Sequence, residues 1–270
     1  MSNMRTVILH HHIFKNAGSS VEASLASNFG EAWRTIDGAT PSSIIKNESI
    51  LDFFKNNPKV KVLSSHQARP FFFMPDGWNI LPLILVRDPL DRIRSCFDYE
   101  HKINSAYPSS MAAQRGIKYY IDFCLDMENP DRINAFRNYQ TLFLSSRLSL
   151  SNDSRSITAV EDDLVDAKQY VARLNVIGIV EYFSMSMAIF EGFLRMDFPS
   201  VKLFANNLNI STNRLQDLDE RKRAFMSEIG VGRYEKLLSE NSLDVELYDY
   251  CLNKFRSIAT NLVKDKVVDF

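Results

Sequence analysis

The sequence predicts an α/β protein with a doubly wound parallel sheet of about five strands, helices on both faces and a helical C-terminal part. Apolar runs of strand length alternate with segments of helical spacing, which is the pattern of a parallel sheet. The runs cover residues 6–13, 60–65, 81–86, 176–180 and 201–204. The run NILPLILV is apolar on both faces, as expected for a strand that helices cover on both sides.

The chain is expected to form a single domain over residues 1–270. Its α/β core spans residues 6–215, and residues 216–270 form a helical extension packed on that core. In this extension Leu247, Tyr248, Cys251 and Phe255 recur at helical spacing, so we expect them to face the core.

Composition excludes several classes of protein. The 270 residues carry a net charge of -1, so no basic surface for nucleic acid is indicated. Three cysteines without a CxxC argue against a disulfide framework or a zinc site. No run approaches the roughly 18 to 20 apolar residues of a membrane helix, so we expect no stable membrane insertion. The first residues have no leader-like apolar region, and a cytoplasmic location is expected.

The most informative segment follows the first strand. Lys15 precedes small residues, which let the backbone curl tightly and direct its N–H groups inward, as in a phosphate cradle. Ser19 and Glu22 have the spacing of a capping box, which predicts a helix that begins at Ser20. The helix dipole would then favour an anion at the loop. The loop residues concerned are Asn16, Ala17, Gly18, Ser19 and Ser20.

Two other interpretations of this loop stay open. A nucleoside-triphosphate P-loop requires GxxxxGK[ST], with the lysine after the glycines, whereas here Lys15 comes first. The loop could equally be an ordinary strand-turn-helix connection with a solvent-exposed lysine.

A second motif, VRDPLDRIRS, follows the most hydrophobic strand. Asp88 is a suitable N-cap and Pro89 a suitable first helical residue, so Arg87 should lie at the tip of a central strand. Ligands bind at such tips in open α/β sheets. Arg87 and Ser95 could converge on one anion, because a guanidinium and a hydroxyl suit a phosphate. Alternatively, Arg87 and Arg92 simply pair with Asp88 and Asp91 on a solvated helix start.

Together the two motifs resemble those of the carbohydrate sulfotransferases that use 3′-phosphoadenosine 5′-phosphosulfate (PAPS). This family includes the heparan sulfate 2-O-sulfotransferases and bacterial relatives. HIFKNAGSS is similar to the family's H-x-P-K-T-x-G-T-S, although Phe14 replaces the proline and Asn16 the threonine. VRDPLDRIRSCF is similar to V-R-D-P-x-x-R-x-x-S-x-Y. The resemblance spans roughly residues 6–215.

The resemblance implies a P-loop-like sulfotransferase fold and a PAPS site, with desulfated PAP as product and no metal required. Lys15 and the backbone of residues 16–20 would hold the 5′-phosphosulfate. Arg87 and Ser95 would hold the 3′-phosphate, and Arg214 could be a further phosphate contact. Lys15 would also neutralise the departing phosphate during transfer.

His66, at the end of the strand KVKVLSS, is the best candidate for the general base. An imidazole is suited to this role near neutral pH, and the resemblance supports it, because uronyl 2-O-sulfotransferases carry a catalytic histidine after the corresponding strand. Glu181 and His101 are weaker candidates. A polar loop histidine without a catalytic role is the alternative.

The run His10, His11, His12 does not predict a metal site. Adjacent residues of a strand point to opposite faces, so only His10 and His12 share a side. His12 matches the family motif and is expected to help position the phosphate loop.

The acceptor would be a hydroxyl of a carbohydrate or glycolipid. A P-loop small-molecule kinase and a non-catalytic nucleotide-binding relative are the alternatives. Residues that could line an acceptor site, or else form core, are Arg69, Phe71, Phe72, Phe73, Trp78, Arg137, Asn138 and Gln140.

Overall fold

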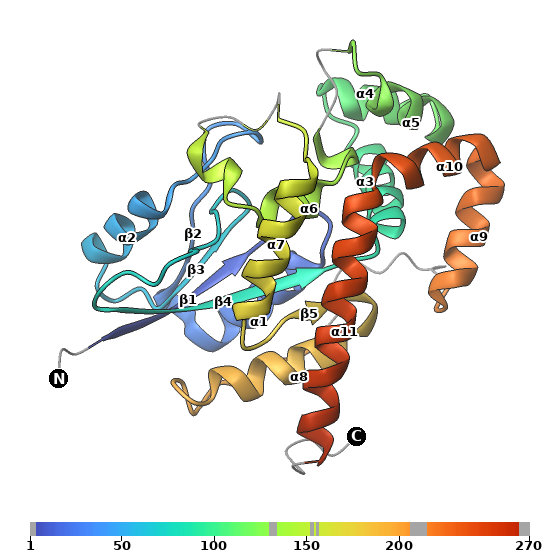
Figure 1. Ribbon diagram of the computed structural model, residues 1–270. Coiled ribbons are helices and arrows are strands. Elements are labelled where there is room, and N and C mark those ends of the chain that lie inside the picture. The colour runs from blue at the N-terminus through green and yellow to red at the C-terminus, as the bar shows by residue number, and fades with distance from the viewer. Residues whose placement is uncertain (1–3, 130–133, 152–153, 155–156, 206–214, 265–270) are drawn as a thin grey trace.

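A computed structural model describes residues 4–129, 134–151, 154, 157–205 and 215–264. Its centre is a sheet of five parallel strands in the order β2-β3-β1-β4-β5 (Figure 1). The strands are β1 (Arg5–His11), β2 (Trp33–Thr35), β3 (Val62–Ser65), β4 (Trp78–Val86) and β5 (Gly178–Ile179). The predicted doubly wound parallel α/β architecture is confirmed.

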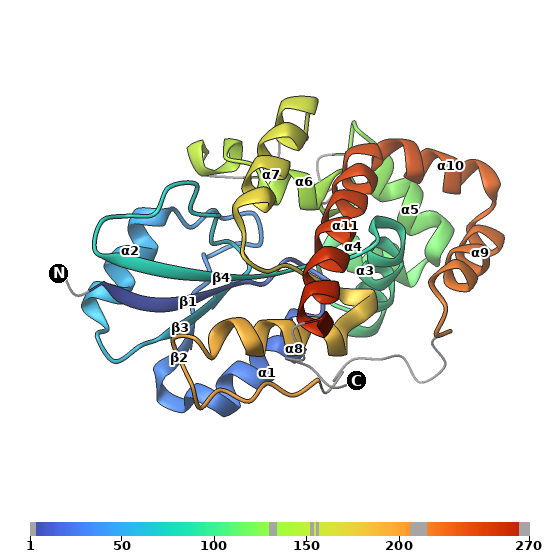
Figure 2. The same cartoon turned by 60° about the horizontal axis from the view of Figure 1, so that its bottom comes forward.

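Helices cover both faces of the sheet (Figure 2). One face carries α1 (Gly18–Phe29) and α8 (Phe183–Leu194), and the other carries α2 (Asn47–Asn56), α6 (Tyr139–Leu144) and α7 (Glu161–Arg173). Alternation along β1 produces this arrangement, because Ile8 packs in one cluster with Val21 of α1 while Leu9 packs in another with Phe54 of α2. Strands that are apolar on both faces need helices on both faces.

Two segments of the sheet differ from the prediction: one predicted strand is absent, and one strand that was not predicted is present. Residues 201–204 form no strand, and their N–H groups bond outside the sheet. Val201 donates to Phe198 O (3.0 Å), Lys202 to Asn28 Oδ1 (2.8 Å) and Phe204 to Ser24 Oγ (3.0 Å). The fifth strand is instead β2, which pairs with β3 at the sheet edge. The sequence did not predict β2 because three half-exposed or exposed residues produce no apolar pattern.

Beyond the carboxyl ends of the strands lie the remaining helices. Asp88 caps α3 (Pro89–Ile103) as predicted, since its Oδ1 accepts from the N–H groups of Leu90 and Asp91 at 3.0 Å, and Pro89 is the first helical residue. The other helices here are α4 (Pro108–Gln114), α5 (Ile117–Leu125), α9 (Leu218–Ile229), α10 (Val231–Glu240) and α11 (Ser242–Lys264). Short 3₁₀ turns occur at Gly30–Ala32, Asn134–Phe136, Arg147–Leu150 and Val180–Tyr182.

The C-terminal helices pack as the sequence predicts. Leu247, Tyr248, Cys251 and Phe255 of α11 are buried in the cluster that also contains β4 and β5 residues. In the described part of the chain, no helix is both long enough and apolar enough to span a bilayer.

The buried histidine His11 predicts a loss of stability in acid. Burial lowers the pKa of His11 from its ordinary 6.5 to about 4, although the Ala68 carbonyl that accepts from Nδ1 (3.1 Å) opposes the shift. Between pH 6.5 and pH 4 the unfolded chain therefore binds a proton at His11 that the folded chain does not bind. The contribution of neutral His11 to the free energy of unfolding is present above pH 6.5 and is lost as the pH falls towards 4. Between pH 7.5 and pH 5 the loss should be about 2 kcal/mol.

Urea unfolding at both pH values measures this loss. His11→Phe, which keeps a flat ring without a titrating nitrogen, should show a pH dependence smaller by that amount. Equal pH dependence in the two proteins would contradict the assignment.

Candidate functional site

A cavity of about 930 Å³ lies at the carboxyl ends of the strands. In a parallel sheet these ends meet at one edge, and ligands bind there. Both sequence motifs contribute to its wall, together with the segments after β3 and β5 and the helix α9. Site residues predicted from the sequence that line it are Lys15, Ala17, Gly18, Ser19, Ser20, His66, Arg87 and Ser95.

The turn between β1 and α1 has an unusual backbone. Lys15 and Ala17 adopt left-handed φ values of 65° and 60°, a conformation that costs an L-residue roughly 1 to 2 kcal/mol. Asn16, between them, is buried and donates from Nδ2 to Leu85 O (2.8 Å) and Gln140 Oε1 (2.7 Å). Its side chain therefore fastens the turn to β4 and α6, a role that the sequence did not predict.

This conformation leaves three N–H groups at the start of α1. Asn16 donates its N–H to Ile13 O (3.1 Å) and Ser20 to Ala17 O (3.1 Å). Among the described residues, no carbonyl accepts from the N–H groups of Ala17, Gly18 or Ser19. The first N–H groups of a helix have no intrahelical partner and lie at the positive end of the helix dipole. These three N–H groups can therefore bind an anion.

The predicted capping box is wrong. Helix α1 begins at Gly18 rather than Ser20, its N-cap Ala17 makes no side-chain cap bond, and Glu22 instead accepts from His12 Nδ1 at 2.9 Å. Gly18 lies against the His12 ring so closely that a Cβ there would come within 2.0 Å of Cδ2. The glycine of the motif is therefore required by contact with the histidine of the motif.

Lys15 forms no ion pair with the described residues. No carboxylate in the described residues lies within ion-pair distance of its Nζ, which is placed 4.3 Å from the centroid of the Tyr99 ring. Burial lowers the pKa of Lys15, and the charge of Arg87 acts in the same direction, while Cys96, Asp98 and Glu100 oppose them. A partly buried, unpaired ammonium at a cavity wall favours the binding of an anion.

Arg87 is already paired. Its Nε and Nη2 lie 2.9 and 2.8 Å from Asp91 Oδ2, and Nη1 donates to Lys15 O at 2.8 Å. The alternative pairing with Asp91 is thus correct, but it is buried rather than solvated. Arg92 pairs with neither aspartate: it is fully buried and bonds to Ala135 O. Arg87 consequently joins the two motifs directly.

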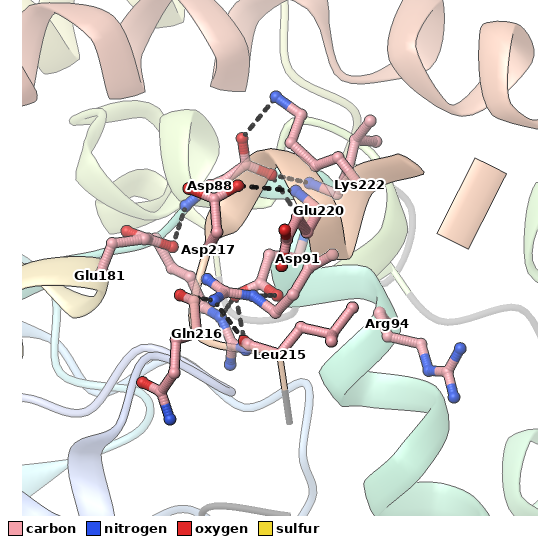
Figure 3. Close-up of polar contacts among 12 residues, drawn as sticks. Asp88, Asp91, Arg94, Glu181, Leu215, Gln216, Asp217, Glu220 and Lys222 are labelled. Carbon is pink, nitrogen blue, oxygen red and sulfur yellow. Dashed lines mark hydrogen bonds and ion pairs between the residues drawn. The ribbon is translucent and has the colours of Figure 1, made fainter. Parts of the chain in front are cut away.

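Helix α9 supplies cations that the sequence did not identify. Arg221 Nε lies 2.8 Å from Asp91 Oδ1, and Lys222 Nζ lies 3.1 Å from Asp88 Oδ2 (Figure 3). Glu181 after β5 accepts from the Asp88 N–H at 3.1 Å and from Tyr248 of α11. Both carboxylate oxygens of Glu181 thus accept hydrogen bonds within the protein. Nothing in the charged pattern of α9 marks Arg221 and Lys222 as cavity residues.

His66 and Asp37 form an imidazole–carboxylate pair at the cavity. Asp37 Oδ2 accepts from His66 Nδ1 at 3.0 Å and its Oδ1 accepts from the His66 backbone N–H at 2.9 Å. Burial works against ionisation of Asp37, but these hydrogen bonds outweigh it and hold its pKa below the ordinary value. Because Nδ1 donates, Nε2 carries the lone pair of the neutral ring. Asp37 follows β2, the strand that the sequence did not predict.

Other predicted residues lie elsewhere. Arg214 is outside the described residues. Phe71 and Phe72 line a second cavity of about 250 Å³, and Phe73 is exposed. Arg137 pairs with Glu240. None of the residues suggested from the sequence for an acceptor site lines the main cavity. No cluster of three or more potential metal-ligating side chains occurs in the ranges described.

The chain is similar in sequence to a protein whose activity is not described. An uncharacterized protein of Archaeoglobus fulgidus is 28% identical over 257 residues, covering 93% of this chain and 98% of its own. No model of a known protein family matches the chain.

The contact between Gly18 and His12 predicts a sensitive position. Gly18→Ala would place a methyl group within 2.0 Å of the His12 ring, so the ring or the turn must move. We expect a loss of about 1 to 3 kcal/mol in the free energy of unfolding, measured in urea. Gly192→Ala is the control, because nothing lies within 4 Å of its added Cβ and alanine favours the helix. Equal stability of both variants would contradict the contact.

Proposed function

We propose that this protein is a PAPS-dependent sulfotransferase that transfers a sulfuryl group to a hydroxyl of a carbohydrate or glycolipid acceptor. One observation carries the proposal. The Lys15 turn, the Arg87–Ser95 segment and His66 follow three adjacent strands, and all line one cavity. The resemblance of the same segments to PAPS sulfotransferases gives this shared location a chemical interpretation.

The β1–α1 turn supports a site for the 5′-phosphosulfate. Lys15 would hold the phosphate oxygens together with the N–H groups of Ala17, Gly18 and Ser19. These groups neutralise the charge that develops on the leaving phosphate, the kind of electrostatic effect that commonly contributes a few kcal/mol. A cavity of about 930 Å³ is in the range of nucleotide-sized ligand sites.

Arg87 and Ser95 would hold the 3′-phosphate at the beginning of α3. The bond from Arg87 to Lys15 O fixes the guanidinium relative to the turn, and Asp91 fixes its plane. A nucleotide that carries phosphates at both ends could then be held by two segments whose spacing is set by a direct hydrogen bond.

His66 would remove the acceptor proton. As the acceptor oxygen bonds to sulfur and the sulfur–phosphate oxygen bond breaks, the hydroxyl proton passes to His66 Nε2 and the electron pair leaves with the phosphate. Asp37 holds Nδ1–H, so the basic nitrogen is Nε2, and Asp37 stabilises the imidazolium that forms.

Donor binding is tested by calorimetric titration with PAP. Lys15→Ala should weaken PAP binding about tenfold to a hundredfold, since a hydrogen bond to a charged group contributes roughly 1.5 to 3 kcal/mol. Lys55→Ala, on the exposed side of α2, is the matched control and should bind PAP as the wild type does. ADP, which lacks the 3′-phosphate, should bind more weakly than PAP. Absence of PAP binding by the wild type would overturn the proposal.

Catalysis is tested with sulfur-labelled PAPS and a panel of carbohydrate and glycolipid acceptors. His66→Ala should lower kcat about 10²- to 10⁴-fold with unchanged PAP affinity, because it removes the base. Asp37→Asn should also lower kcat, by a smaller factor, because Nδ1–H loses its charged acceptor. Wild-type PAP binding without transfer to any acceptor would instead indicate a non-catalytic nucleotide-binding protein.

A further inference from the structure

Three imidazole rings form a stack that leads from the sheet into the cavity. His10 of β1 and His12, which follows the strand, lie on the same side as predicted, and their ring centroids are 5.5 Å apart with an interplanar angle of 27°. His12 and His66 are closer, at 3.9 Å and 26°. His10 and His12 are buried, whereas the His66 side chain is 40% exposed. The stack therefore connects the candidate base to the protein interior.

Each ring is fixed at Nδ1 by a different element. His10 contacts Ser64 Oγ of β3 (3.2 Å), His12 contacts Glu22 of α1 (2.9 Å), and His66 contacts Asp37 after β2 (3.0 Å). Burial lowers the pKa of His10, so the innermost ring stays neutral. Each partner anchors one edge of its ring.

His66 is the most exposed member of the stack. Its side chain is 40% exposed and is held at Nδ1 by Asp37, as the two inner rings are held by their own partners. The face of His12 packs against one face of His66 and limits rotation of that ring about its Cβ–Cγ bond. His12 itself is enclosed, with Glu22 at one edge and Gly18 against its ring.

We propose that His12 is a positioning residue for His66: its ring face holds the plane of His66 so that Nε2 stays directed at the acceptor hydroxyl. This rests on the proposed function of His66 as the base. The helix α1 would thereby serve both substrates, with its first N–H groups at the donor phosphate and Gly18 packed against the ring that supports the base. Small errors in the position of a catalytic group cost large factors in rate.

Two substitutions separate the stack from the hydrogen bond. His12→Phe keeps a flat ring and removes the bond to Glu22, whereas His12→Asn keeps a donor for Glu22 and removes the ring. We expect kcat of His12→Asn to fall about tenfold to a hundredfold, while His12→Phe stays within about threefold of the wild type. PAP affinity is measured for both variants, and the fall in kcat of His12→Asn should exceed any change in PAP affinity, since the His12 side chain supplies no phosphate ligand.

A spectroscopic readout tests the stack without requiring turnover. The ring protons of His66, assigned with His66→Gln, should be shifted upfield by the His12 ring current in the free wild-type protein. The shift should persist in His12→Phe and disappear in His12→Asn, with circular dichroism confirming that both variants are folded.

The proposal is overturned if His12→Asn retains wild-type kcat, if both variants lose kcat equally, or if the His66 protons show no upfield shift in the wild type. A wild type that transfers no sulfuryl group would defeat the proposed function instead, and the proton shifts would still decide whether His12 orients His66.

Discussion

The turn between β1 and α1 is the constraint on which the rest of the site depends. Two left-handed positions within three residues, at Lys15 and Ala17, are unfavourable for residues with a Cβ, so the surrounding structure must impose them. Asn16 ties the turn to β4 and α6, and Arg87 holds the Lys15 carbonyl. As a result, Lys15 and the first residues of α1 line the same cavity.

Charge compensation distinguishes the cations of the cavity from one another. Arg87 and Arg221 share Asp91, and Lys222 contacts Asp88, so each has a carboxylate partner. Such pairs are costly to break when they are buried, and they hold their members in place. Lys15 has an aromatic ring as its neighbour instead. The site thus combines arginines held in place by Asp91 with a Lys15 ammonium that lines the cavity and makes no ion pair with the described residues.

Segments far apart in the sequence complete the cavity. Helix α9 brings Arg221 and Lys222 to the beginning of α3 (Figure 3), and Tyr248 of α11 bonds to Glu181 after β5. The helical C-terminal part is therefore more than packing for the core, because it neutralises the acids around Arg87. On the opposite side, Asp37 and Glu22 each hold a histidine, so the cavity has a cationic end and an imidazole end.

The sequence by itself determined the parallel α/β class, the helix that begins after Asp88, and the meeting of Lys15, His66 and Arg87 at one sheet edge. Apolar runs, a capping aspartate and the common direction of parallel strands are local or topological signals, and a sequence carries them. It could not determine β2, since a three-residue edge strand has no apolar period, nor Asp37, which that strand places beside His66. Only the tertiary structure paired Glu22 with His12 rather than with the helix start, and placed α9 against Asp88 and Asp91. Such choices depend on which side chains compete for a buried partner, and that competition is decided by packing between distant segments.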